Sequence, residues 1–204
     1  MTREMLFALA LGYLLGSIPF GLVLTRLAGK GDIRRIGSGN IGATNVLRTG
    51  SKLLAALTLV LDCLKATVAI LLAREFFGDP LSDFAERYAA AGVMIGHLYP
   101  AWLKFRGGKG VATFLGVLIP ILPIAAAAYA AIWLLLLLTI RISSVAGMTA
   151  AASAPVTALI AGARSLFPLL LGFAVLVLWK HRENILRLMK GTEPRIGSKT
   201  SPTA

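Results

Sequence analysis

Long apolar runs constrain this chain more than any other feature of its sequence. A helix of about 20 apolar residues can cross a bilayer, and runs close to that length recur along the chain. Apolar residues make up 57% of the sequence and charged residues 15%, against about 45–50% and about 25% in soluble domains. This composition excludes a soluble globular fold and a disordered chain. It predicts an all-α, polytopic integral membrane protein.

The apolar runs predict about seven membrane-spanning helices. The run over 111–140 is too long for one helix and contains Pro120 and Pro123, which favour a turn, so we divide it there. We expect a single transmembrane domain over 1–193 and a disordered polar tail over 194–204. The expected spans are 5–27, 53–73, 88–103, 111–120, 124–140, 144–162 and 165–180.

Basic residues indicate the orientation. Most of the 21 Lys and Arg residues lie in the segments 26–52, 104–109 and 180–199, and loops rich in Lys and Arg stay on the cytoplasmic side of a membrane. Dividing the run over 111–140 supplies the even number of crossings needed between the second segment and the third. Seven spans then place the N-terminus outside and the C-terminus in the cytoplasm. Topology therefore explains the net charge of +12 better than nucleic-acid binding does.

Few polar residues lie inside the expected spans. Asp62 and Lys65 are three residues apart, so on one helix face they can pair with each other, with a proton relay as the alternative. Pro19 is expected to bend the first span. Two glycine pairs have the spacing that lets helices pack closely. They are Gly12 with Gly16, and Gly92 with Gly96.

The first polar segment is GSGNIGATNVLR, residues 37–48. Its glycines allow backbone N–H groups to form a concave anion nest, and its hydroxyl and amide side chains add hydrogen-bonding groups. If 43–48 is helical, Thr44, Asn45 and Arg48 share a face. A simple glycine-rich connector is the alternative. The candidate residues are Gly37, Ser38, Gly39, Asn40, Thr44, Asn45 and Arg48.

The second polar segment is HLYPAWLKFRGGKGVAT, residues 97–113. Its glycines and Lys109 at the start of a helix resemble a phosphate cradle. A Walker A loop would need Ser or Thr where Gly110 stands, so ATP hydrolysis is not supported. Lys104 and Arg106 are interpreted as basic anchors beside interfacial aromatic residues. The candidates are Gly107, Gly108, Lys109 and Gly110.

The third polar segment is HRENILRLMKGTE, residues 181–193. His181 and Asn184 are three residues apart, so on a helix they face the same way. The alternative is a basic amphipathic tail on anionic lipid, which we accept for Arg187 and Lys190.

Cations and neutral donors with few acids suit a phosphate-bearing substrate. A metal site is not expected, because His97 and His181 lie in different segments and no Cys or carboxylate cluster joins them. A serine hydrolase using Ser38 and His181 would lack an acidic residue to orient the histidine.

The three segments, in this order and spacing, closely resemble the bacterial acylphosphate-dependent glycerol-3-phosphate acyltransferases, as does GSIPFG at 16–21. The resemblance spans most of the chain. It implies an enzyme of the bacterial inner (cytoplasmic) membrane whose active site faces the cytoplasm. It further implies transfer of a fatty acyl group from acyl phosphate to the sn-1 hydroxyl of glycerol 3-phosphate, giving lysophosphatidic acid and phosphate as the first acylation step of phospholipid synthesis. The implied partners are these two substrates and membrane lipid, with no cofactor.

The resemblance also assigns residue roles. Ser38 and Arg48 correspond to the family's essential Ser and Arg, and the glycines around Lys109 correspond to its glycerol 3-phosphate site. His181 and Asn184 would join the same pocket. His181 is interpreted first as a substrate binder and second as a base, because in this family the donor's own phosphate is thought to accept the proton. The implied catalytic residues are Ser38, Arg48, Lys109, His181 and Asn184, and Glu193 is implied to hold the third segment in place.

Two other classes of protein stay open at this point. A transporter of phosphate or a lipid phosphate would need polar residues through the membrane midplane, where only Asp62 and Lys65 are available. A structural membrane scaffold would not need Ser38, Arg48 or Lys109 at all.

Overall fold

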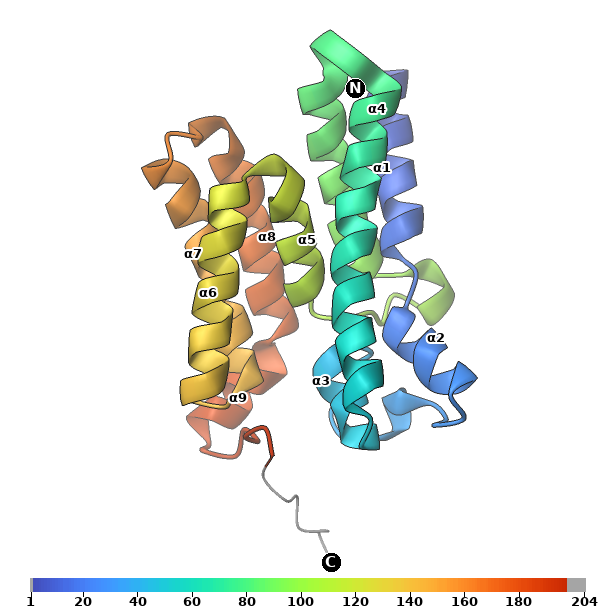
Figure 1. Cartoon of the computed structure of the whole chain (residues 1–204), viewed down its shortest axis with the longest axis vertical. Coiled ribbons are helices and arrows are strands. Elements are labelled where there is room, and N and C mark those ends of the chain that lie inside the picture. The colour runs from blue at the N-terminus through green and yellow to red at the C-terminus, as the bar shows by residue number, and fades with distance from the viewer. Residues whose placement is uncertain (1, 198–204) are drawn as a thin grey trace, which may run out of the picture. The chain divides into compact units, whose positions relative to one another are not determined.

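The computed structural model describes residues 2–197, without the side chains of 78–82. Its chain forms two compact units, Met1–Pro123 and Ile124–Ala204, and each is described by itself. Every regular element among the described residues is a helix (Figure 1). The prediction of an all-α protein is confirmed.

The first unit begins with α1 (Arg3–Gly16) and α2 (Phe20–Leu27), which together are apolar enough for one membrane span. The helix is interrupted at residues 17–19, where the predicted bend falls. Pro19 has no N–H to donate, so the helical hydrogen-bond pattern cannot continue through it. The interruption leaves backbone carbonyls there for partners elsewhere in the unit.

The longest helix, α4 (Lys52–Leu98), reverses its direction within its 47 residues (Figure 1). Lys65 Nζ lies 2.9 Å from His97 Nδ1, although 32 residues of straight helix would separate them by about 48 Å. We predicted two spans, 53–73 and 88–103, with a loop between them. The intervening residues 74–87 are instead assigned to the helix, and its second limb ends at Leu98, two residues before Pro100.

Four glycines bring α1 and α4 together. A Cβ atom on Gly12, Gly16, Gly92 or Gly96 would lie 2.2 or 2.3 Å from a backbone carbonyl oxygen of the facing helix. Any larger residue would force the two helices apart, so the predicted packing role of these glycines is confirmed.

The rest of the first unit consists of short elements and α5. They are η1 (Ile33–Arg35), α3 (Ala43–Val46), η2 (Leu47–Thr49), η3 (Ala101–Leu103) and α5 (Val111–Ile121). The α5 helix packs on α4, where Thr67 Oγ1 donates to Gly116 O at 2.8 Å. It ends at Ile121 and α6 begins at Pro123, as the predicted division of the long apolar run requires.

The second unit contains α7 packed against α8, and α8 is followed by a bend of 58° into α9. Its elements are α6 (Pro123–Thr139), α7 (Ser143–Ile160), η4 (Arg164–Leu166), α8 (Phe167–Lys180) and α9 (Arg182–Met189). The tail we predicted to be disordered begins at 194. The Ile196 N–H donates to Arg141 O at 2.7 Å, and the Arg141 side chain donates from Nη2 to Ile196 O at 2.9 Å. Residues 198–204 lie outside the described residues.

Three described helices are long and apolar enough to cross a membrane, namely Arg3–Leu27, Lys52–Phe77 and Ser143–Ile160. The bent pair Arg164–Lys180 and Arg182–Met189 adds a fourth, and α5 and α6 are shorter apolar helices. These helices support a polytopic membrane protein. The count of seven spans and the orientation stay predictions.

Candidate active site

Asn45 organises the first polar segment from inside. Its side chain is buried, and Nδ2 donates to Ile33 O at 2.7 Å and to Asn40 O at 2.8 Å. Its Oδ1 accepts from the backbone N–H of Ser38 at 3.2 Å. The loop itself therefore engages both ends of this amide, and Asn45 shapes the segment around it.

The helical stretch after the glycines buries one of its three predicted polar residues and exposes the other two. Residues 43–49 are helical as α3 and η2, but Asn45 points inward while Thr44 and Arg48 are exposed. Burial thus separates Asn45 from Thr44 and Arg48, although Asn45 and Arg48 both lie against Gly37. Apolar residues on the inner side explain this, because Ile33 and Val46 belong to one buried cluster.

Arg48 lies across the backbone of Gly37. Gly37 has a φ of +54°, and a Cβ atom there would lie 2.5 Å from Arg48 Cδ and 2.6 Å from Asn45 Oδ1. Only glycine fits this position, because it tolerates the left-handed conformation and leaves room for the arginine. The exposed Ser38 directly follows Gly37, the glycine that Arg48 contacts. A hydroxyl and a guanidinium therefore border the same glycine turn.

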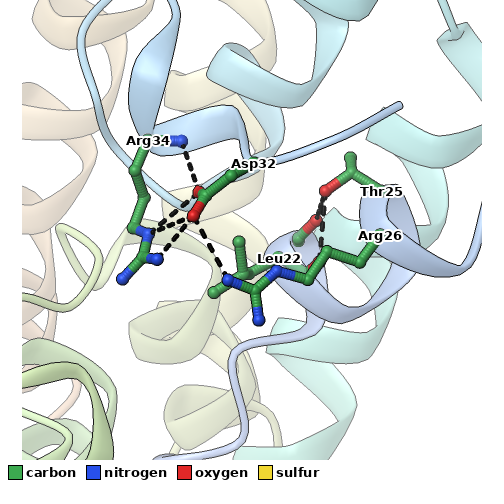
Figure 2. A network of polar contacts seen from close by, with 6 residues as sticks. Leu22, Thr25, Arg26, Asp32 and Arg34 are labelled. Carbon is green, nitrogen blue, oxygen red and sulfur yellow. Dashed lines mark hydrogen bonds and ion pairs between the residues drawn. The ribbon is translucent and has the colours of Figure 1, made fainter. Parts of the chain in front are cut away.

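A second network, which sequence reasoning missed, holds the chain just before this turn (Figure 2). Asp32 accepts hydrogen bonds from Arg34 Nε at 2.9 Å and from Arg26 Nη2 at 3.2 Å. The hydrogen bond from Arg34 holds the pKa of Asp32 well below its usual value. Asp32 also accepts from the Arg34 backbone N–H and so caps the start of η1. The carbonyl of Ile33 in η1 is the one that accepts from Asn45 Nδ2. In the sequence, the spacing of Asp32 two residues before Arg34 was the signal that could have indicated this ion pair.

The second polar segment closes back onto the end of α4. The N–H of Gly107 donates to Leu98 O at 3.2 Å, and the N–H of Gly108 donates to His97 O at 3.0 Å. A Cβ on Gly107 would lie 2.1 Å from His97 O, and one on Gly108 would lie 2.1 Å from His97 Nε2. These two glycines are therefore required for the loop to close, before any ligand is considered.

The start of this loop is fastened to α1. Tyr13 Oη donates to Tyr99 O at 3.0 Å and accepts from the N–H of Ala101 at 3.0 Å. Trp102 Nε1 donates to Ser17 O at 2.9 Å, which occupies one carbonyl of the interrupted turn. Trp102, one of the interfacial aromatic residues beside Lys104 and Arg106, thus also anchors the loop.

Beneath the loop lies a buried network of Asp62, Lys65 and His97, whose exposed fractions are 3%, 5% and 4%. Lys65 Nζ lies 2.7 Å from Asp62 Oδ1 and 2.9 Å from His97 Nδ1, and it donates to Ile18 O at 2.8 Å. The predicted pairing of Asp62 with Lys65 is confirmed. Sequence reasoning missed the part of His97, whose 32-residue separation from Lys65 gave no signal.

Lys109 and Gly110 lead into α5. Gly110 caps this helix with a φ of +86°, and its carbonyl accepts from the N–H of Phe114 at 2.7 Å. The half-buried Lys109 thus stands directly before a helix N-terminus, where backbone N–H groups also attract anions. Leu103 of the same loop packs on the apolar cluster that contains Ile41 and Val46, so the first two polar segments adjoin.

His181 and Asn184 belong to the second unit, at the bend between α8 and α9. His181 is buried, and its Nδ1 lies 2.8 Å from Val177 O. A carbonyl oxygen can only accept, so Nδ1 carries a proton and the neutral ring has its lone pair on Nε2. Asn184 Nδ2 donates to Glu193 Oε1 at 2.6 Å.

Glu193 joins three parts of the second unit. Besides Asn184, Ser144 Oγ donates to Oε1 and Arg187 Nε donates to Oε2, each at 2.7 Å. Burial alone would raise the pKa of Glu193, but these hydrogen bonds outweigh it and leave the pKa below its usual value. The carboxylate thereby holds the segment after α9 against both α7 and α9.

Together these features define a polytopic helical membrane protein with two adjoining glycine-rich loops, each bordered by a cation and suited to phosphate groups. Among the described residues no group of three His, Cys, Asp or Glu could hold a metal ion.

A family model described as glycerol-3-phosphate acyltransferase matches residues 6–191, and the chain belongs to this family. The glycerol-3-phosphate acyltransferase of Mesorhizobium japonicum is 52% identical, over 98% of this chain and 100% of the relative. That of Agrobacterium fabrum is also 52% identical, over 97% and 96%.

Solved structures agree with this assignment. A crystal structure of PlsY, an integral membrane glycerol 3-phosphate acyltransferase, in its glycerol 3-phosphate form has a TM-score of 0.87 at 39% identity, covering 95% of this chain and 96% of that one. Its lysophosphatidic acid form has a TM-score of 0.84.

Proposed function

We propose that this chain transfers a fatty acyl group from acyl phosphate to the sn-1 hydroxyl of glycerol 3-phosphate, giving lysophosphatidic acid and inorganic phosphate. One observation carries the proposal: the family match runs through the first two polar segments and into the third. Two structural neighbours are named for their glycerol 3-phosphate and lysophosphatidic acid forms, which are the acceptor and product of this reaction. Family membership supports an acyltransferase over the transporter that the sequence left open.

The site residues suit this chemistry. Acyl phosphate is already an activated mixed anhydride, so the protein mainly has to bring two phosphate-bearing molecules together. Arg48 at the Gly37 turn and Lys109 before α5 supply positive charge on the two adjoining loops of the first unit. We assign the phosphate groups to these loops, with Ser38 and backbone N–H groups as further donors.

In the reaction itself, the sn-1 oxygen attacks the carbonyl carbon, the bond from that carbon to the phosphate oxygen breaks, and phosphate leaves. The hydroxyl proton goes to the departing phosphate. His181 has its lone pair on Nε2 and is assigned first to binding, with proton acceptance second. Asn184, three residues further along, is likewise assigned to substrate binding.

We further propose that both compact units belong to one transmembrane domain of seven spans over 1–193, in the bacterial inner membrane. The N-terminus would lie outside, and the three polar segments would lie on the cytoplasmic side. The Lys and Arg residues of 26–52, 104–109 and 180–199 support this orientation.

The direct test supplies purified protein with acyl phosphate and glycerol 3-phosphate, without coenzyme A or added metal. We expect lysophosphatidic acid and phosphate to form in equal amounts. Acyl-coenzyme A in place of acyl phosphate serves as the control donor and should give no product. Failure to form lysophosphatidic acid in several detergents and lipid mixtures would overturn the proposal.

A further inference from the structure

The buried Asp62–Lys65–His97 network connects three parts of the first unit that are distant in sequence. Lys65 lies on the first limb of α4, His97 ends the second limb, and Ile18 belongs to the turn between α1 and α2. The ammonium group has three donors and finds three acceptors there: Asp62 Oδ1, Ile18 O and His97 Nδ1.

This bonding fixes the tautomer of His97. A lysine ammonium beside a carboxylate has no lone pair to accept with, so His97 Nδ1 must be the acceptor and the ring proton must be on Nε2. Nε2 is the ring atom that faces Gly108, where an added Cβ would lie 2.1 Å away. The backbone carbonyl of the same histidine accepts from the Gly108 N–H at 3.0 Å. His97 therefore meets the glycine-rich loop with both its ring and its backbone.

Stability alone is a poor reason for this arrangement. A buried ion pair loses the hydration of two charges, and replacing it with apolar residues of similar size often leaves stability unchanged or higher. Apolar residues could replace the Asp62–Lys65 charge pair without loss of stability, but they could not orient the His97 ring as Lys65 does.

We propose that Asp62, Lys65 and His97 are positioning residues for glycerol 3-phosphate: they fix the His97 ring beneath the Gly107–Gly108 turn and so hold the loop that presents Lys109. This inference rests on the proposed function for its substrate. The network acts through the loop and does not touch the reacting atoms. Its removal raises the KM for glycerol 3-phosphate and leaves kcat at saturation nearly unchanged.

The experiment compares two double variants of the full chain. Asp62→Leu with Lys65→Met removes the network's charges without leaving one unpaired. Arg74→Met with Glu86→Leu is the matched control. It removes another ion pair of α4, in which Arg74 also donates to Pro120 O. Along the helix, Arg74 is about 14 Å from Lys65, and Glu86 is about 17 Å from His97.

Two measurements are made on each variant. Steady-state kinetics should show a rise of about 10-fold in the KM for glycerol 3-phosphate in the network variant. A misplacement of about 1 Å can cost about 100-fold in rate, so a rise of this size needs only a small displacement of the loop. Hydrogen exchange should show faster exchange of the Gly107 and Gly108 amides in the same variant, because their hydrogen bonds to the end of α4 open more often. The control variant should match the wild type in both.

Wild-type KM and wild-type amide exchange in a folded network variant would overturn the inference, as would a fall in kcat with unchanged KM. If the double variant does not fold, His97→Asn replaces it. That substitution keeps an acceptor near Lys65 but removes the ring beneath Gly108, and unchanged KM and exchange would again overturn the inference. Absence of turnover in the wild type would refute the proposed function. Amide exchange at Gly107 and Gly108 would still show whether the network holds the loop.

Discussion

Replacing Asn45 with Asp tests how the first polar segment is built. The substitution keeps the shape of the side chain and its Oδ1, which accepts from Ser38 N–H. It replaces Nδ2, which donates to the carbonyls of Ile33 and Asn40 at 2.7 and 2.8 Å, with an oxygen that cannot donate when ionised. The buried carbonyl of Ile33 and the half-buried carbonyl of Asn40 lose their donor and face a negative charge instead.

The expected cost follows from those two contacts. Leaving a buried polar group unsatisfied costs about 1–3 kcal/mol, so Asn45→Asp should destabilise the protein by about 2–6 kcal/mol. For a chain of this length each 1 kcal/mol lowers the unfolding midpoint by about 2–4 °C. We therefore expect a fall of roughly 10 °C in a thermal unfolding measurement in detergent. Acidification should narrow the deficit, because a protonated carboxyl can again donate one hydrogen bond.

Asn40→Asp provides the matched control. Asn40 Oδ1 accepts from the N–H of Gly42 at 2.8 Å, and a carboxylate accepts equally well. The same chemical change five residues away should therefore alter stability by less than about 0.5 kcal/mol. If the two variants unfold at the same temperature, the buried amide of Asn45 does not shape the loop.

Three further predictions concern the rest of the site. Gly107→Ala should lower kcat/KM for glycerol 3-phosphate by about 100-fold and more than Gly108→Ala does, because its Cβ would meet a backbone carbonyl, whereas the other would meet the His97 ring, which can give way by loosening its contact with Lys65; equal effects in steady-state kinetics would contradict this. Arg48→Ala or Lys109→Ala should abolish lysophosphatidic acid formation without lowering the unfolding midpoint, and normal turnover in both would refute the phosphate-binding assignment. Because folding lowers the pKa of Glu193, its carboxylate contributes its full stabilisation above the ordinary pKa of 4.5, and this stabilisation is lost as the pH falls through the folded-state pKa. Glu193→Gln should therefore reduce the loss of stability at acid pH, measured as the unfolding midpoint against pH. An unchanged loss would exclude the carboxylate as its source.

Apolar periodicity and proline placement predicted the helices well, because both act locally. The two prolines at 120 and 123 located the end of α5 and the start of α6 within a few residues. Residues 74–87 were misread as a loop because charged side chains there interrupt the apolar run. Charge reports whether a segment meets water, and a helix can continue through water when its backbone hydrogen bonds are satisfied within it. The sequence therefore predicted where the apolar limbs of α4 lie and missed that the helix continues between them.

Polar residues in a motif were harder to interpret, since the sequence does not say which of them the fold itself uses. Asn45 looked like a substrate ligand, yet its amide is engaged by the loop. Thr44 and Arg48 are exposed on the same short helix. Local spacing cannot separate these cases, because the direction of the helix face is set by the apolar cluster beneath it.

The glycines of the second segment show the same division between fold and ligand. We interpreted Gly107 and Gly108 as positions that let a phosphate approach the backbone, but the structure requires them first for closure over His97. That requirement depends on the reversal of α4, which brings His97 to Lys65 across 32 residues. A ligand-binding loop that is built on such a contact inherits its geometry from the helix beneath it. Substrate affinity should therefore respond to buried residues that no substrate touches.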